Sequence, residues 1–205
     1  MSTILVIAPH PDDETLGCGG TLLRHGKEGD DVHWMIVTDM TADSGFSSAR
    51  MAKREEEIVA VANAYCFSGV HRLGLPTAKL DTLALGTVID SMADVISSIK
   101  PDILYLPFPG DAHSDHHVSF LAASACAKTF RYTFIRKVLC MEVLSETNFG
   151  MHPAQEPFRA NSYVDVSDYM DDKLTIMALY EDEMGEFPFP RSEAVIRAQA
   201  ALRGS

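Results

Sequence analysis

Short apolar runs alternate with longer amphipathic segments along most of the chain. Five runs have the length of strands and contain few polar residues: Ile4–Ala8, Val32–Thr38, His71–Leu75, Ile103–Pro107 and Lys137–Val143. Continuous apolar runs are typical of strands that are buried on both faces of a sheet. We therefore expect a sheet that is covered on both sides.

Segments with the apolar spacing of helices separate these runs. The clearest is Ala49–Tyr65, where Met51, Ile58 and Val61 are separated by charged residues. Further helices are predicted at about Thr15–Lys27, Leu83–Lys100 and Asp115–Thr129, and from about Ser167 and Ser192, with one more short strand at Tyr163–Val166. This alternation predicts an α/β protein, a Rossmann-like three-layer α/β/α sandwich with a mainly parallel sheet. The common doubly wound strand order starts 3-2-1-4-5.

Composition narrows the class of protein. With 205 residues, 46% of them apolar, the chain is expected to form a single domain over residues 1–205. The net charge of -12 argues against a nucleic-acid partner, which needs clustered Lys and Arg. Neither a signal peptide nor an apolar stretch of the roughly 20 residues that span a bilayer is recognisable. We expect a soluble, cytoplasmic protein without stable membrane insertion.

The cysteines of the chain are widely scattered and include no C-x-x-C pair. This spacing favours reduced thiols over a disulfide framework or a thiolate zinc site. The four are Cys18, Cys66, Cys126 and Cys140.

The first apolar run leads directly into a cluster of ionisable residues. It ends in A-P-H-P-D-D-E, residues 8–14, so that His10, Asp12 and Asp13 fall within four positions. Carboxylates this close repel each other, and their burial is unfavourable unless a positive charge lies among them. A divalent cation would resolve that conflict, and the two prolines stiffen the loop.

A second cluster, G-D-A-H-S-D-H-H at residues 110–117, follows the fourth predicted strand and opens a helix. His113 and His116 are three residues apart, so both can face the same side of a first helical turn. The histidines outside the two clusters show no pattern, and we expect them to be surface or core residues: His25, His33, His71 and His152.

The predicted topology brings the two clusters together. Strands 1 and 4 are neighbours in the order 3-2-1-4-5, and ligands bind in the crevice between their carboxyl ends. A His/Asp/His set of ligands, completed by water, is typical of a catalytic zinc site.

Two simpler interpretations compete with a metal site. Asp12 and Asp13 could cap the following helix while the histidines are solvated. The glycines of Gly17-Cys18-Gly19-Gly20 could belong to a nucleotide-binding loop, but the G-x-G-x-x-G spacing is missing. Tight packing of the helix behind the loop is the use that we expect for these glycines.

The two clusters together resemble the signature of the LmbE-like, or PIG-L, family of N-deacetylases. A-P-H-P-D-D-E is followed by L-G-C-G-G-T and later by H-S-D-H, in the family's order and spacing. Further similarities are Arg54-x-x-Glu57, L-G-L-P at 73–76, S-E-T at 145–147, and Arg191 with Ser192. The resemblance covers nearly the whole chain. It implies a Rossmann-like enzyme that hydrolyses N-acetyl groups of sugars or sugar conjugates.

The resemblance also implies roles for individual residues. His10, Asp13 and His116 match the residues that bind one zinc ion per chain. The sequence leaves open another divalent metal in place of zinc. Asp12 matches the general base. His113 matches the histidine that stabilises the oxyanion and can act as an acid.

Arg54 matches an arginine that contacts the substrate, although its place in K-R-E-E-E also fits local ion pairing along a helix. Asp115 lies between the two histidines and is predicted to orient His113 or to raise its basicity.

The chain departs from the family pattern in two places. It stops at A-L-R-G-S where related chains continue, so a short C-terminal segment is expected to be missing from the domain. Phe189 stands where the family has a histidine in P-H-P-R-S. The expected partner is a small N-acetylated sugar or conjugate, and the sequence leaves open whether the chain forms a homo-oligomer.

Two other functions remain open from the sequence alone. One is a metal-dependent hydrolase of a different amide or ester, including a phosphoesterase. The other is a non-catalytic protein that keeps a metal pocket. An intact Asp12 and His113 favour catalysis, because a binding site needs neither of them.

Overall fold

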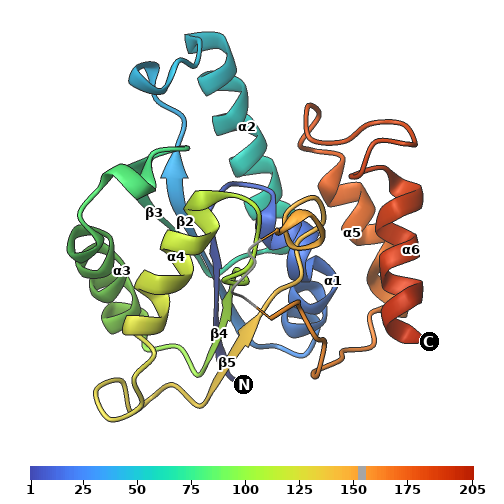
Figure 1. Ribbon diagram of the computed structural model, residues 1–205. Coiled ribbons are helices and arrows are strands. Elements are labelled where there is room, and N and C mark those ends of the chain that lie inside the picture. Colours follow the sequence, from blue (N-terminus) through green and yellow to red (C-terminus); the bar gives the residue numbers. More distant parts are fainter. Residues whose placement is uncertain (152–155) are drawn as a thin grey trace.

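The computed structural model describes residues 1–151 and 156–205, so His152 lies outside the described residues. Five parallel strands form one sheet in the order β3-β2-β1-β4-β5 (Figure 1). The strands are β1 (Thr3–Ala8), β2 (Asp31–Asp39), β3 (Gly69–Pro76), β4 (Ile103–Leu106) and β5 (Lys137–Cys140). The predicted fold class and strand order are confirmed.

Helices cover both faces of this sheet. One layer holds α1 (Asp13–Lys27), α2 (Ser48–Tyr65), α5 (Met170–Met177) and α6 (Glu193–Gly204). The other layer holds α3 (Leu85–Ile99) and α4 (Ser114–Ala125). Short 3₁₀ helices lie at Ala42–Ser44, Leu80–Thr82, Thr147–Phe149 and Ser167–Tyr169. None of the helices in the described ranges has the length and apolarity that a membrane span requires.

The central strand β1 explains why both layers form. Successive side chains of a strand point to opposite faces, so Ile4 and Val6 enter the core under α1 and α2 while Leu5 and Ile7 enter the core under α3 and α4. All four side chains are fully buried. Burying such a side chain stabilises the fold by about 1.5–3 kcal/mol.

The prediction of a short strand at Tyr163–Val166 is wrong, because these residues form no strand. Val166 packs so closely on Gly20 of α1 that a Cβ at Gly20 would lie 2.8 Å from the Cβ of Val166. The carbonyl of Asp165 accepts a hydrogen bond from the Arg24 side chain at 3.3 Å. This segment therefore packs against α1 and does not pair with β5.

Most other predicted boundaries move by one to four residues. β5 ends at Cys140 instead of Val143, and α4 ends at Ala125 instead of Thr129. Ser192 precedes α6 and caps it, with its hydroxyl accepting from the backbone N–H of Val195.

The glycines after the first strand serve close packing, as expected. They lie inside α1, which kinks at Cys18. A Cβ at Gly17 would lie 2.9 Å from the Cβ of Met141, and one at Gly19 would lie 2.5 Å from the Tyr65 hydroxyl. All four cysteines are free thiols, in agreement with their spacing.

Candidate active site at the carboxyl ends of β1 and β4

The β1–α1 loop is fixed from several directions. The carboxylate of Asp13 accepts a hydrogen bond from the backbone N–H of His10 at 2.9 Å, which closes a tight turn. The carbonyl of Pro9 accepts from the Thr38 hydroxyl on β2 at 2.9 Å, and the carbonyl of Pro11 accepts from Arg54 on α2 at 2.6 Å. The loop that carries the ionisable residues is therefore held by both neighbouring elements.

Asp12 has an unusual backbone conformation at the start of α1. Its φ is 134°, a value that residues with a side chain rarely adopt. The backbone is held on both sides, since its N–H donates to the Glu14 carboxylate at 3.0 Å and its carbonyl accepts from Leu16 at 2.9 Å. Strain of this kind persists where the surroundings enforce it, and it is concentrated at functional sites.

The side chain of Asp12 makes no capping hydrogen bond to α1, and the carboxylate of Asp13 bonds to His10. His116 is fully buried. The interpretation of the two aspartates as helix caps beside solvated histidines is therefore wrong.

The β4–α4 loop supplies the remaining histidines. His113 is the N-cap of α4, and its Nδ1 accepts from the backbone N–H of Asp115 at 3.1 Å. One turn later, Nδ1 of His116 lies 2.8 Å from the carboxylate of Asp111. That carboxylate also accepts from the Thr147 hydroxyl at 2.6 Å. The ring of His116 therefore has a fixed orientation.

The two loops meet at Asp13. Its Oδ2 lies 3.1 Å from Nε2 of His116 and 3.5 Å from Nδ1 of His10. The potential ligand atoms of His10, Asp13 and His116 all lie within 4.8 Å of one another. The structure thus brings together the three predicted metal ligands, from segments about a hundred residues apart.

The donor set fits a divalent metal ion. Nε2 of His116 is buried and has no hydrogen-bond partner within the described residues, despite its short distance to Asp13. The outer nitrogens are occupied, since Nε2 of His10 lies 3.0 Å from Asp115 and Nδ1 of His116 bonds to Asp111. Histidines that bind metals are characteristically held by carboxylates through the outer nitrogen in this way.

The charges of the cluster also favour a cation. Burial by itself lowers the pKa of His10, but contacts with Asp115 and Asp13 outweigh burial and raise that pKa to about 9. Burial likewise opposes the charge of His116, while the neighbouring Asp13 and Asp111 raise its pKa well above its ordinary value. Carboxylates thus draw positive charge to this point, where a metal ion would take the place of the protons.

Asp115 contacts a different histidine from the one predicted. Its Oδ2 lies 3.0 Å from Nε2 of His10 but 4.0 Å from Nδ1 of His113. Backbone N–H groups of Ala78 and Leu80 donate to the same carboxylate at 2.7 and 3.0 Å. The side chain of Asp115 therefore orients His10, and its backbone N–H orients His113.

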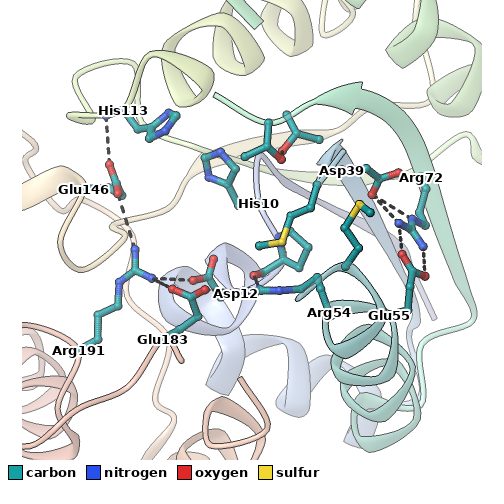
Figure 2. A pocket seen from close by; sticks show the side chains of 15 residues that line it. His10, Asp12, Asp39, Arg54, Glu55, Arg72, His113, Glu146, Glu183 and Arg191 are labelled. Carbon is teal, nitrogen blue, oxygen red and sulfur yellow. Dashed lines mark hydrogen bonds and ion pairs between the residues drawn. The ribbon is translucent and has the colours of Figure 1, made fainter. Parts of the chain in front are cut away.

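A cavity of about 200 Å³ opens beside the cluster, and His10, Asp12 and His113 line it (Figure 2). Arg54 also lines the cavity, with its guanidinium almost fully buried between Pro11, Glu57 and Glu183. The structure therefore places Asp12, His113 and Arg54 around one space. Burial, together with the charge of Asp13, raises the pKa of Asp12, and the guanidinium of Arg191 opposes that rise.

Several residues of the site received no role from the sequence. Arg191 donates to Asp12 at 2.7 Å, to Glu183 at 3.0 Å and to the Ser145 hydroxyl at 2.7 Å. Glu146 accepts from the backbone N–H of His113 at 3.1 Å. The S-E-T and R-S motifs are recognisable in the sequence, but only the fold shows that Glu146 and Arg191, one from each motif, line the same cavity. Phe189 packs on Gly185 instead and does not line the cavity.

Comparisons with known proteins agree with this arrangement. The chain is 29% identical over 211 residues to the diacetylchitobiose deacetylase of Thermococcus kodakarensis, covering 98% of this chain and 77% of that protein. The conserved protein TT1542 from Thermus thermophilus has the same fold, with a TM-score of 0.74 at 22% identity over 99% of this chain and 87% of that one.

The same fold also carries a different reaction. The 4-carboxy-2-hydroxymuconate hydratase of Pseudomonas putida KT2440 superimposes with a TM-score of 0.69 at 18% identity, covering 100% of this chain and 86% of that one. Fold alone therefore does not define the activity.

The model of the PIG-L family, described as GlcNAc-PI de-N-acetylase, matches residues 5–127, which is more than half of the chain. The chain therefore belongs to the PIG-L family and to the N-deacetylase class of hydrolases.

Proposed function

We propose that the protein is a zinc-dependent hydrolase that removes an N-acetyl group from a sugar or sugar conjugate. The observation that carries the proposal is the buried Nε2 of His116, which faces Asp13 without a hydrogen bond while Asp111 fixes the other side of the ring. His10, Asp13 and His116 would hold the ion. Their nitrogen and oxygen donors suit zinc, with the remaining positions open to water and substrate.

A bound divalent ion would supply a Lewis acid that polarises the acetyl carbonyl and lowers the pKa of water. Asp12 is the proposed general base, and it lies on the cavity wall beside this point. Arg191 holds Oδ2 of Asp12 at 2.7 Å, so the carboxylate has a fixed direction. A carboxylate in this position can take a proton from the attacking water.

His113 is proposed to stabilise the oxyanion. Because its Nδ1 accepts from the backbone of Asp115, the ring carries its proton on Nε2 and can donate it to the carbonyl oxygen as negative charge develops. Hydroxide adds to the acetyl carbon, the C–N bond then breaks, and the nitrogen takes up the proton that left the water. The products are acetate and a free amine.

Arg54 is proposed to contact the substrate from the cavity wall. Its hydrogen bond to the carbonyl of Pro11 gives it a second use, because this bond also fixes the loop between His10 and Asp12. The soluble, cytoplasmic location remains a prediction.

The decisive experiment measures bound zinc by elemental analysis and acetate release from a panel of N-acetylated sugars. We expect about one zinc per chain and acetate from at least one sugar. A zinc-loaded protein that releases acetate from no sugar but hydrolyses another amide or an ester would overturn the sugar substrate. A zinc-loaded protein that hydrolyses none of these sugars, amides or esters would contradict an enzymatic function.

A further inference from the structure

Three arginines line the cavity, and each is already bonded to carboxylates. Arg72 on β3 donates through two nitrogens to Oδ1 of Asp39, at 2.7 and 3.1 Å. The same guanidinium forms a two-pronged pair with Glu55 on α2. Every nitrogen of this guanidinium thus points at an acidic side chain, as the right side of Figure 2 shows.

Arg54 and Arg191 also pair with carboxylates. In Figure 2, Arg191 lies on the left and Arg54 lies between Asp12 and Glu55. Both donate to Glu183. Arg54 also pairs with Glu57 at 3.0 Å, and Arg191 also pairs with Asp12 at 2.7 Å. An arginine neutralised by two carboxylates offers little attraction to another anion.

Away from the metal cluster, the charges of the cavity wall are unbalanced toward the negative, because Asp39 and Glu55 are two carboxylates on the single guanidinium of Arg72. Within the described part of the chain, the lining contains three arginines and five acidic residues. The acidic ones are Asp12, Asp39, Glu55, Glu146 and Glu183. The wall at Arg72 therefore has a net negative charge, and such a wall of a partly enclosed cavity repels anionic ligands.

We infer that this site accepts uncharged N-acetyl glycosides and discriminates against those that carry a phosphate or carboxylate on the sugar. The inference rests on the proposed function, and it selects one substrate class within it. Sugar hydroxyls are hydrogen-bond donors, and carboxylates are acceptors with several lone pairs. Both bonds from Arg72 fall on Oδ1 of Asp39, so Oδ2 is available to accept from a sugar hydroxyl.

The test compares N-acetylglucosamine with N-acetylglucosamine 6-phosphate, which differ only in the phosphate. Acetate release by the zinc-loaded enzyme gives kcat/KM for both. We expect kcat/KM of the neutral sugar to be at least about tenfold higher, because like charges placed together in a binding site are strongly unfavourable. Equal or faster turnover of the phosphorylated sugar would overturn the inference.

Glu55→Gln tests the cause of this preference. The substitution keeps the size of the side chain but leaves Arg72 with one carboxylate, so the preference for the neutral sugar should fall by about fivefold. Glu28→Gln removes the same charge from an exposed position at the end of α1, away from the cavity, and should leave the preference unchanged. An unchanged preference in Glu55→Gln would overturn the inference, and Asp39→Asn provides the same test if Glu55→Gln does not fold.

Failure of this inference differs from failure of the proposed function. Acetate from the phosphorylated sugar at an equal or higher rate keeps the deacetylase and removes the discrimination. If no sugar in the panel releases acetate, the proposed function itself is contradicted. Calorimetric binding of glucosamine and glucosamine 6-phosphate to the zinc-loaded protein then measures the charge preference directly. Equal or tighter binding of the phosphate would overturn the preference in that case as well.

Discussion

Two clusters of histidine and carboxylate lie at opposite ends of the same sheet, and only one has the properties of a metal site. His10, Asp13 and His116 lie at the carboxyl ends of β1 and β4, and His25, Glu28 and Asp30 lie near the amino ends. In both clusters the potential ligand atoms are within 4.8 Å of one another. Composition and proximity therefore do not separate them.

The hydrogen bonds of the second cluster make the difference. Nδ1 of His25 bonds to Asp30 at 2.8 Å, and Nε2 bonds to the hydroxyl of Tyr105 at 3.0 Å. Asp30 also accepts from the backbone of Ser2, and Glu28 pairs with Arg24. A cation would have to break these bonds. At the other end, the buried Nε2 of His116 has no hydrogen bond to lose.

The largest expected effect comes from matched histidine substitutions. His116→Ala should remove bound zinc and reduce acetate release to background, because Asp13 and His10 alone leave the ion with too few ligands. His25→Ala should keep both zinc and activity. Elemental analysis and an acetate assay measure the outcome. Full activity in His116→Ala, or zinc loss in His25→Ala, would reverse the assignment of the two clusters.

The next effect separates metal binding from catalysis within the first cluster. Asp12→Asn keeps the shape of the side chain and removes the proposed base. We expect the rate to fall by about 10²–10⁴-fold while zinc content stays the same. Steady-state kinetics with parallel zinc analysis measures both quantities. A rate close to that of the unmodified enzyme would exclude Asp12 as the base.

A smaller effect concerns the carboxylates that hold the histidines from outside. Asp111 bonds to His116 just as Asp30 bonds to His25, both at 2.8 Å. Asp111→Asn should weaken zinc binding by about 10–100-fold, the usual effect of losing such a partner. Asp30→Asn is the matched control and should not change zinc affinity in a competition titration with a chelator. Equal zinc affinity of the two variants would argue against a metal at His116.

The smallest effect is on stability. His25→Ala removes the partner of the Tyr105 hydroxyl and one of the partners of the Asp30 carboxylate, which should lower the free energy of unfolding by about 1–3 kcal/mol. Urea denaturation measures this loss. Zinc at about 100 times its dissociation constant should add about 2.7 kcal/mol to the stability of this variant, and nothing to that of His116→Ala. A zinc response in His116→Ala would show that the ion binds elsewhere.

The sequence determined the fold and the location of the site. Apolar runs and helical periodicity are local properties. Together with right-handed crossovers they leave few ways to arrange such a chain, and 3-2-1-4-5 is a common one. The same order places His10 and His116 at neighbouring strand ends. Residues 163–166 show where this reasoning fails. The edge strand β5 has a free side, yet contacts with α1 hold this segment, and an apolar pattern does not reveal that choice.

Only the tertiary structure decided which side chains hold the site together. Asp115 is adjacent in sequence to the histidines of α4, yet its carboxylate orients His10, 105 residues away. Arg191 reaches Asp12 across 179 residues, and it joins Glu183 and Ser145 in one network. The neutralisation of Arg72 by Asp39 and Glu55 likewise joins β2, β3 and α2. Such pairings depend on side-chain directions after packing, and no local pattern encodes them.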